Sequence, residues 1–407
     1  MSTVLVIVTS PTLEGFAQVR IEDAIYLDYQ AATPVDPRVA EAMRETMLTD
    51  FANPSSDDHA LGWKAHQRVE LARAAIADAF GAAWGGLIFT SGATEGNNIA
   101  ILGGARNAPP ERRRVLISAI EHKAVLEAAS ALAAEGYDIE RLPVDTSGCL
   151  DLDVLEALEG TTVAVISVMA VNNETGVVQP VRAVAQWAKR HGVFFHCDAT
   201  QAPLAMEVDL SSWGVDAASL SSHKIYGPKG IGVLYLADDR PWTPRPLTFG
   251  GGQEQSIRPG TLPTPLCVGF ATASMLVSRE GAAERERVAS LRDSFVASLR
   301  DLDPGLRLTA PSGDRHPGNA HVVFSRADAA DLLALLQPVV AASLGSACTS
   351  GVIGPSHVLT AMGVSDSDAS RCVRFSLGRF SDAAQLAEAS HAIAKALNKQ
   401  RGRALPA

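Results

Sequence analysis

The sequence predicts an α/β protein with a large domain built on a mostly parallel sheet and a smaller α+β domain at its C-terminal end. Between about residues 60 and 235, short apolar runs typical of strands alternate with amphipathic stretches, as in crossover units on a parallel sheet. After residue 280 the pattern changes to amphipathic helices around short strands. With 407 residues, 47% of them apolar, the chain is long enough for two domains. We expect an extension of unknown role over residues 1–24, a large domain over 25–280 whose first residues pack with the small domain, and a small domain over 281–407.

Composition excludes several classes of protein. The formal net charge of −10, with one short basic run at residues 112–114, argues against direct nucleic-acid binding. The longest clean apolar runs, such as residues 4–8, are far shorter than the roughly 18 residues that span a bilayer, so no membrane segment is expected. Five scattered cysteines and the lack of a signal-peptide pattern indicate reduced thiols and a cytoplasmic protein.

The elements of the large domain follow in order. Apolar residues at helical spacing predict a helix over residues 63–80, and Gly81 stands where that helix would end. Several of the following apolar runs are continuous, as in strands that are covered on both faces. The strands are expected at residues 87–90, 115–118, 163–168, 193–198, 216–222 and 231–236.

The small domain is predicted from weaker patterns. Apolar residues at helical spacing between 288 and 299 predict one helix, and those between 386 and 397 predict a closing helix. Residues 321–324 and 373–377 are expected to be strands.

The first strand of the large domain leads into a turn of small residues, 91–96, followed by a helical segment. Free amide groups and the positive end of the helix dipole would suit a phosphate there, and Thr94 adds a hydroxyl. A tight strand-to-helix turn needs the same small residues for backbone reasons, so the turn alone leaves both interpretations open.

The strand over residues 193–198 ends in His196, Cys197 and Asp198. Side chains alternate along a strand, so Cys197 points away from the other two and the three do not form a metal site. Asp198 is either a helix cap or ion-pair partner, or the carboxylate that holds the protonated ring nitrogen of a pyridine cofactor.

A further strand, residues 216–222, delivers Lys224 into a glycine-rich loop at residues 226–230. Carboxyl ends of parallel strands meet at one edge of the sheet, where ligands bind. A lysine, an acid and a phosphate turn at that edge are together what pyridoxal 5'-phosphate requires, namely a Schiff base, a ring partner and an anchor.

At this point the chain resembles a known family, the fold-type I pyridoxal-phosphate enzymes of aminotransferase class V, and within it the cysteine desulfurases of the NifS/IscS type. The resemblance runs from about residue 26 to residue 380. It is carried by YLDY (26–29), AATP (31–34), SGATE (91–95), EHK (121–123), VNNETG (171–176), DATQ (198–201), SHKIYGPKG (222–230), RPGT (258–261), SACTS (346–350) and RFSLGR (374–379).

The resemblance implies roles around the cofactor ring. Lys224 binds the cofactor as a Schiff base and then moves the proton at the substrate Cα, and Asp198 pairs with the ring nitrogen. His122 stacks on the ring and carries protons near the substrate thiol. Gln201 and Asn173 contact the phenolic oxygen of the cofactor or the substrate.

The resemblance also implies how phosphate and substrate are held. Arg374, together with Asn173, takes the substrate carboxylate, for which a planar guanidinium is suited. Thr261 is similar to a residue that reaches the phosphate from the other subunit, which implies a homodimer. The phosphate is held within the chain by Ala93, Thr94, Ser221 and His223.

Cys348 identifies the reaction. It lies in a stretch of small residues, about 344–356, that is typical of an exposed, mobile loop. Cys149, Cys267 and Cys372 are instead expected to be small core residues. A thiolate at Cys348 would take the sulfur of cofactor-bound L-cysteine as a persulfide, leaving L-alanine, and pass it to an acceptor protein.

Departures from the commonest family pattern leave the acceptor open. Phe249 and Gln253 stand where related enzymes often have histidines, Pro259 replaces a common serine, and the chain ends soon after Phe380. Iron–sulfur assembly and thio-modification of tRNA or DNA both remain expectations. The alternatives are a selenocysteine lyase, a β-lyase or an aminotransferase on the same scaffold, and a non-catalytic assembly subunit.

Overall fold

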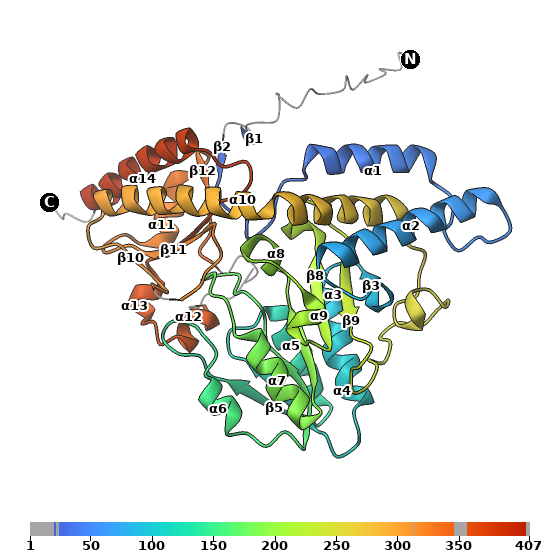
Figure 1. The fold of residues 1–407 in the computed structure, drawn as a ribbon. Helices are drawn as coiled ribbons and strands as arrows, with labels where there is room; N and C mark the ends of the chain where they lie inside the picture. The colour runs from blue at the N-terminus through green and yellow to red at the C-terminus, as the bar shows by residue number, and fades with distance from the viewer. Residues whose placement is uncertain (1–19, 22–23, 312, 346–355, 404–407) are drawn as a thin grey trace, which may run out of the picture.

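A seven-stranded sheet forms the centre of the large domain in the computed structural model, which describes residues 20–21, 24–311, 313–345 and 356–403 (Figure 1). Its strand order is β3-β9-β8-β7-β6-β4-β5, and only β9 runs antiparallel to its neighbours. The strands are β3 (Leu87–Thr90), β4 (Arg114–Ser118), β5 (Asp138–Leu142), β6 (Val163–Ser167), β7 (Phe194–Asp198), β8 (Ala217–Ser221) and β9 (Gly232–Leu236). The prediction of a mostly parallel sheet is confirmed.

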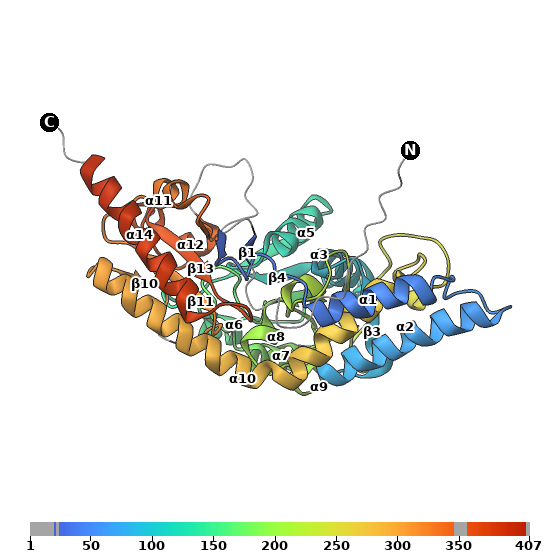
Figure 2. The same ribbon diagram turned by 90° about the horizontal axis from the view of Figure 1, so that it is seen from above.

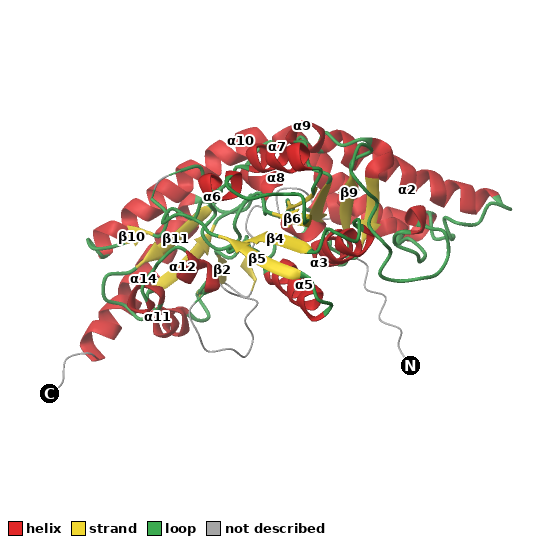
Figure 3. Cartoon of the chain, turned by 90° about the horizontal axis from the view of Figure 1, so that it is seen from below, coloured by secondary structure: helices red, strands yellow, loops and turns green. Residues whose placement is uncertain are grey.

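Helices cover both faces of this sheet (Figure 3). Neighbouring residues of each strand enter different cores: Phe89 and Phe195 pack on one side, while Ile88 and Phe194 pack on the other. This explains why several of the strands are continuously apolar. The helices and helical turns of this domain are α1 (Pro37–Thr49), α2 (Ala60–Ala79), α3 (Ala93–Asn98), α4 (Gly104–Asn107), α5 (Lys123–Ala134), α6 (Leu152–Glu156), α7 (Val181–His191), α8 (Ala202–Ala205) and α9 (Leu210–Trp213).

One long helix, α10 (Thr264–Leu302), runs along the molecule and joins its two parts (Figure 1, Figure 2). Its first half contributes Phe270 to the core of the large sheet, and its second half contributes Phe295 to a separate core. The domain boundary expected near residue 280 therefore falls inside a continuous helix, and the helix expected over residues 288–299 is its second half.

The small domain contains two three-stranded sheets, β10-β11-β13 and β1-β2-β12. Ile25 of β2 pairs in parallel register with Val340 of β12, so the first described residues pack with the small domain. The strands are β1 (Arg20–Ile21), β2 (Ala24–Tyr26), β10 (Arg307–Leu308), β11 (Asn319–Val323), β12 (Val340–Ala341) and β13 (Cys372–Ser376). The helices are α11 (Ala329–Leu336), α12 (His357–Ala361), α13 (Asp366–Ala369) and α14 (Ala383–Arg403).

No helix in the described part of the chain is both long enough and apolar enough to cross a membrane.

Candidate active site

The carboxyl ends of β3, β4, β6, β7 and β8 lie at one edge of the large sheet, because these strands run in the same direction. A cavity of about 610 Å³ opens there. It is lined by all the candidate site residues except Thr261 and Cys348, namely Ala93, Thr94, His122, Asn173, Asp198, Gln201, Ser221, His223, Lys224 and Arg374. Thr261 is exposed outside this cavity, and Cys348 lies outside the described residues.

Lys224 follows β8 in a short 3₁₀ turn, Ser222–Lys224. Its Nζ donates hydrogen bonds to the backbone oxygens of Gln30 and Ala31, both at 2.7 Å. These carbonyl groups belong to the segment between β2 and α1. The amine is therefore held at the floor of the cavity by a part of the chain that is remote in sequence.

The same segment fixes the backbone of the lysine turn. Thr33 Oγ1 donates to the oxygen of His223 at 2.9 Å and accepts from the Tyr226 N–H at 2.7 Å. Tyr226 is fully buried and has a φ of 67°, an unfavourable conformation for a residue other than glycine. We infer that these contacts compensate for that strain and set the position of Lys224.

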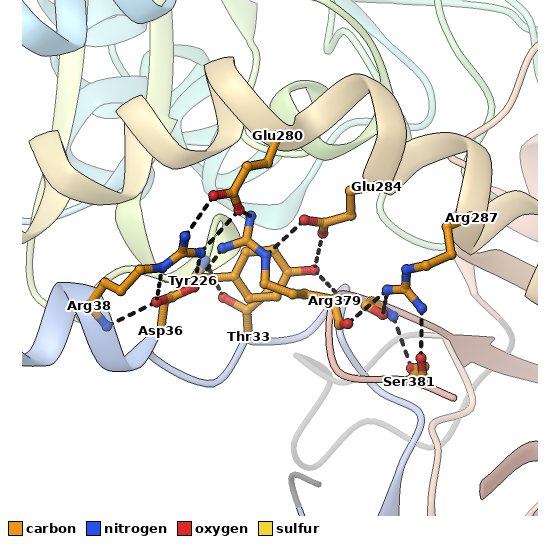
Figure 4. Close-up of polar contacts among 10 residues, drawn as sticks. Thr33, Asp36, Arg38, Tyr226, Glu280, Glu284, Arg287, Arg379 and Ser381 are labelled. Carbon is orange, nitrogen blue, oxygen red and sulfur yellow. Dashed lines mark hydrogen bonds and ion pairs between the residues drawn. The ribbon is translucent and has the colours of Figure 1, made fainter. Parts of the chain in front are cut away.

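A polar network connects this turn to α10 and to the small domain (Figure 4). The Tyr226 hydroxyl donates to Glu284 of α10 at 2.8 Å and accepts from the Arg379 N–H at 2.7 Å. The Arg379 guanidinium binds Glu284 and Asp36, both at 2.7 Å, and lies 4.3 Å from the centre of the Tyr226 ring. Burial alone would raise the pKa of Asp36, but hydrogen bonds from Arg38 and Arg379 hold it below its ordinary value.

Asp198 ends β7 and is 5% exposed. Its two carboxylate oxygens accept from Asn97 Nδ2 at 2.7 Å and from the Thr200 N–H at 3.0 Å. Among the described residues, no basic side chain lies within 4 Å of this carboxylate. Asn97 Oδ1 and Thr200 Oγ1 are buried without partners in the same part of the chain, and both residues line the cavity. Such an acid suits a cationic ring nitrogen.

The turn after β3 forms a small concave cradle. Gly92 has a φ of 152°, and a Cβ at this position would lie 3.7 Å from Ser221 Oγ. The turn is braced by Glu95, which accepts from the Ser91 N–H at 2.5 Å. Residues 93–107 then run as one helix with a π-helical turn at Ile99–Gly103. The first N–H groups of a helix have no acceptors within it, and here they lie at the end next to the cavity.

His223 lies on the other side of this cradle, with its Nδ1 2.9 Å from Ser221 Oγ. Burial and the neighbouring ammonium groups of Lys224 and Lys229 lower the pKa of His223 to about 4. A neutral imidazole carries one N–H, so while the Ser221–His223 hydrogen bond is kept, one of the two groups, either His223 Nε2 or Ser221 Oγ, can donate to an anion. The donor set, two hydroxyls with helix N–H groups, fits a phosphate.

His122 is the N-cap of α5, and its Nδ1 accepts from the Ala124 N–H at 3.1 Å. In its neutral form the ring therefore carries its proton on Nε2. The preceding residue, Glu121, is fully buried beneath the site and accepts from Ser118 Oγ and the Met169 N–H. Burial raises the pKa of Glu121 to about 8.

Arg374 projects from β13 and is 2% exposed. Its Nη2 binds Asp28 at 2.7 Å, and its Nη1 donates to the backbone oxygens of Asn173 at 2.6 Å and Gly345 at 3.2 Å. Its Nε has no partner among the described residues. Burial raises the pKa of Asp28 despite this ion pair. The guanidinium is therefore tied to Asp28 and to two backbone oxygens at the edge of the cavity.

The histidine near the end of β7 is held by two serine side chains. No described group of three histidine, cysteine or acidic residues is arranged to hold a metal ion. His196 instead lies buried between Ser167 Oγ, at 2.9 Å, and Ser219 Oγ, at 3.0 Å. Burial lowers the pKa of His196 to about 4, so the ring is neutral at pH 7.

Several residues of the site were not predicted from the sequence. Gln30, Asn97, Thr200 and His357 also line the cavity. Asn97 follows Thr94 by one helical turn, and that spacing was the signal that could have identified it. Gln30 and His357 reach the site only through tertiary packing.

Comparisons with known proteins agree with this geometry. The family model described as "Aminotransferase class-V" matches residues 25–388. The chain is 41% identical to "Cysteine desulfurase IscS" of Rickettsia bellii over 377 residues, which cover 93% of this chain and 92% of the relative. A solved structure titled "NIFS-LIKE PROTEIN" superimposes with a TM-score of 0.86 and 32% identity over 92% of this chain and all of that one. Another, "SspA in complex with cysteine", has a TM-score of 0.78 and 36% identity over 87% of this chain and 99% of that one.

Proposed function

The chain belongs to the aminotransferase class V family and is a cysteine desulfurase, and from this premise we propose how its residues carry out the reaction. The cysteine desulfurases of this family depend on pyridoxal 5'-phosphate and remove sulfur from L-cysteine. The arrangement of Lys224, Asp198 and the turn after β3 around one cavity is the observation that carries the proposal.

The cavity residues fit pyridoxal phosphate. Lys224 would hold it covalently. Asp198, whose carboxylate has no cationic partner among the described residues, would hold the protonated ring nitrogen. Ser221, His223 and the N–H groups after Gly92 would hold the phosphate. When bound, the cofactor supplies a ring that accepts electrons from the substrate and so weakens the bonds near its Cα.

Lys224 and His122 are the proton carriers in this proposal. The Lys224 amine is held by two carbonyl oxygens and would take the proton from the substrate Cα at Nζ. His122 presents a proton on Nε2, since its Nδ1 is engaged by the Ala124 N–H. For the ring to gain a second proton, that capping bond must break, so His122 is best suited to donate a hydrogen bond from Nε2 to the substrate thiol.

Cys348 is the proposed sulfur carrier. The other four cysteines are poor nucleophiles: burial raises the pKa of Cys267 to about 12 and of Cys372 to about 11, and it also raises those of Cys149 and Cys197. None of these four lines the cavity. Gly345 and His357, which flank the segment that contains Cys348, both do.

The proposed enzyme works as a homodimer. Trp63 and Trp84 are 59% and 55% exposed and line one cavity of about 800 Å³. Such an exposed apolar patch is typical of an interface. Thr261 lies outside its own chain's active-site cavity, which accords with a contact to the partner's phosphate.

The direct test is to incubate the purified enzyme with L-cysteine and a reductant and to measure L-alanine and sulfide. We expect equal amounts of both, and we expect the Lys224→Ala variant to lose the visible absorbance of the bound cofactor together with turnover. Pyruvate in place of alanine would indicate a β-lyase. Transfer of the amino group of L-cysteine without release of sulfide would indicate an aminotransferase.

A further inference from the structure

The first turn of α12 joins the small domain to two loops of the active site. Ser356, the N-cap of α12, is buried, and its Oγ donates to Glu174 Oε2 at 2.6 Å. The next residue, His357, is half-buried and has its Nε2 2.9 Å from the backbone oxygen of Glu121. Glu174 lies in the loop after β6 and Glu121 in the loop after β4, so two consecutive residues of the small domain hold two strand-end loops.

The two loops are also tied to each other. Asn172 Nδ2 donates to the Ile120 oxygen at 3.0 Å, and Asn172 Oδ1 accepts from the Glu174 N–H at 2.9 Å. Val358 of α12 packs with Ile120 in one apolar cluster. The contacts of α12 therefore close a ring of interactions, in which the loop after β4 is fixed from both domains.

The position of one proton in this ring follows from the contact itself. A backbone carbonyl oxygen can only accept, so His357 Nε2 carries a proton and donates it to the Glu121 oxygen. That oxygen belongs to the peptide group whose nitrogen is that of His122. Because a peptide group is planar, a hydrogen bond to its oxygen fixes the plane from which the His122 residue starts.

The direction of the His122 ring depends on this peptide group. His122 Nδ1 accepts from the Ala124 N–H at 3.1 Å, a capping bond that couples the ring to the backbone around it. Rotation of the preceding peptide group would therefore move Nε2, the atom that serves the substrate thiol in the proposed function. His122 and His357 both line the active-site cavity, so their link lies at its wall.

We propose that His357 is a positioning residue for His122, which holds the peptide group before His122 and so directs His122 Nε2 at the sulfur of L-cysteine. The proposal rests on the proposed function and deepens it, because it gives the small domain a part in the step at the sulfur. Ser356 and Glu174 support His357 in turn, through the hydrogen bond at the start of α12. We expect the effect on kcat rather than on cofactor binding, because the hydrogen bond acts on the approach to His122.

The test compares three substitutions of His357. His357→Phe keeps a ring and removes the donor, so we expect kcat for L-cysteine to fall about fivefold to tenfold at unchanged KM, the effect of one lost hydrogen bond. In His357→Gln the side-chain nitrogen lies as many bonds from Cα as the histidine Nε2, so this variant should retain most of the wild-type kcat. The amide of His357→Asn is too short to reach the same oxygen, so its kcat should match that of His357→Phe.

A double-mutant cycle shows whether His357 acts through His122. His122→Asn keeps an oxygen that can cap α5 and removes the Nε2 proton, so it should lower kcat by itself. In that background we expect His357→Phe to cause no further loss, because the group that it positions is gone. His391→Phe is the control and should keep the wild-type kcat, since His391 is exposed on α14 and does not line the cavity.

Unchanged kcat in folded His357→Phe and His357→Asn would overturn the proposal. A loss as large in the His122→Asn background as in wild type would also overturn it, because His357 would then act on another group. Melting temperature and cofactor absorbance show whether each variant is folded and loaded, and if His357→Phe does not fold, the comparison of His357→Asn with His357→Gln decides. A wild-type enzyme that releases no alanine from L-cysteine would instead contradict the proposed function, which is a separate outcome.

Discussion

Buried polar atoms without partners are informative at the scale of single residues. Gln30 Nε2, Asn97 Oδ1, Thr200 Oγ1 and Arg374 Nε all lack partners within the described residues, and all four residues line one cavity. Such atoms are uncommon in folded proteins and each costs free energy. Four of the thirteen such atoms among the described residues thus belong to residues that line this cavity.

Glu121 gives a prediction about pH. Its pKa is raised by burial to about 8, so the folded protein keeps the proton between about pH 4.5 and 8 while the unfolded chain loses it. In that range the native state binds more protons, and Glu121 therefore lowers the free energy of unfolding as pH rises. Between pH 5 and pH 8 the free energy of unfolding should fall less in Glu121→Gln than in wild type. We expect the difference to be on the order of a few kcal/mol. Urea denaturation at each pH measures this.

Glu121→Gln keeps an oxygen that can accept from Ser118 Oγ and the Met169 N–H, the two donors that the carboxyl now binds. Other buried acids are present in both wild type and Glu121→Gln. One of them is Asp216, and burial raises its pKa to about 7. The difference between the two pH profiles therefore isolates Glu121. Identical profiles would show that Glu121 is ionised in the folded protein.

The sequence alone identified the residues whose chemistry is distinctive. A lysine, an acid and small residues at strand ends can be recognised because parallel strands bring their carboxyl ends together. Gln30 and Asn97 could not be singled out from the sequence in the same way. Amide side chains are common, and the partners of these two come from remote segments of the chain. Asn97 contacts Asp198 and Gln30 contacts Asn319, 101 and 289 residues away in sequence.

At the scale of elements, the segment before α10 is held in an unusual backbone conformation. Glu254, Gln255 and Ser256 have φ values of 49°, 58° and 61°. Glu254 is buried, binds Arg73 of α2 at 2.7 Å and accepts from the Phe89 N–H of β3 at 2.5 Å. Three consecutive left-handed residues are strained, so we infer that this ion pair holds the segment against α2 and β3.

Arg73→Met should destabilise the protein by about 3 to 5 kcal/mol, because it leaves the Glu254 carboxylate buried without a cation. Guanidinium denaturation measures the loss. The double variant Arg73→Met with Glu254→Gln also removes the unpaired carboxylate, so it should recover part of the lost stability. If the double variant is as unstable as the sum of the two single variants, the ion pair is not the cause.

The elements that the sequence did not predict have clear reasons. Strand β5 is mostly exposed or half-buried and carries charges, so it lacks an apolar run. The first half of α10 packs small residues such as Gly269, Ala271 and Ala273 against α1 and α2, and helical periodicity is hard to see where several faces are buried. Two-residue strands such as β10 and β12 leave no pattern at all.

At the scale of the whole molecule, the lysine turn is built where three parts of the chain meet. Tyr226 of the large domain, Glu284 of α10 and Arg379 of the small domain form one network (Figure 4). Because Arg374 and Arg379 are close in sequence, the position of the small domain affects both the proposed carboxylate site at Arg374 and the lysine turn. The site therefore depends on both parts of the chain, which the sequence patterns of each part do not reveal.

The proposed dimer gives the prediction at this scale. Trp84→Glu places a charge in the exposed apolar patch and should shift sedimentation toward the monomer. The monomer should also retain less cofactor after gel filtration, since Thr261 of the partner would be lost. Val339→Glu, at a residue 39% exposed in the small domain, is the control and should remain dimeric. A wild-type protein that sediments as a monomer would contradict the dimer.

The central claim is that sulfur from L-cysteine passes to Cys348. The most direct measurement is to mix the loaded enzyme with one equivalent of L-cysteine without reductant, digest it and locate the added sulfur by peptide mass spectrometry. The account predicts one extra sulfur atom on the peptide with Cys348 and one equivalent of L-alanine, with no sulfur added to Cys149, the half-buried cysteine. Full alanine release by Cys348→Ala, with no persulfide on that peptide in wild type, would contradict it.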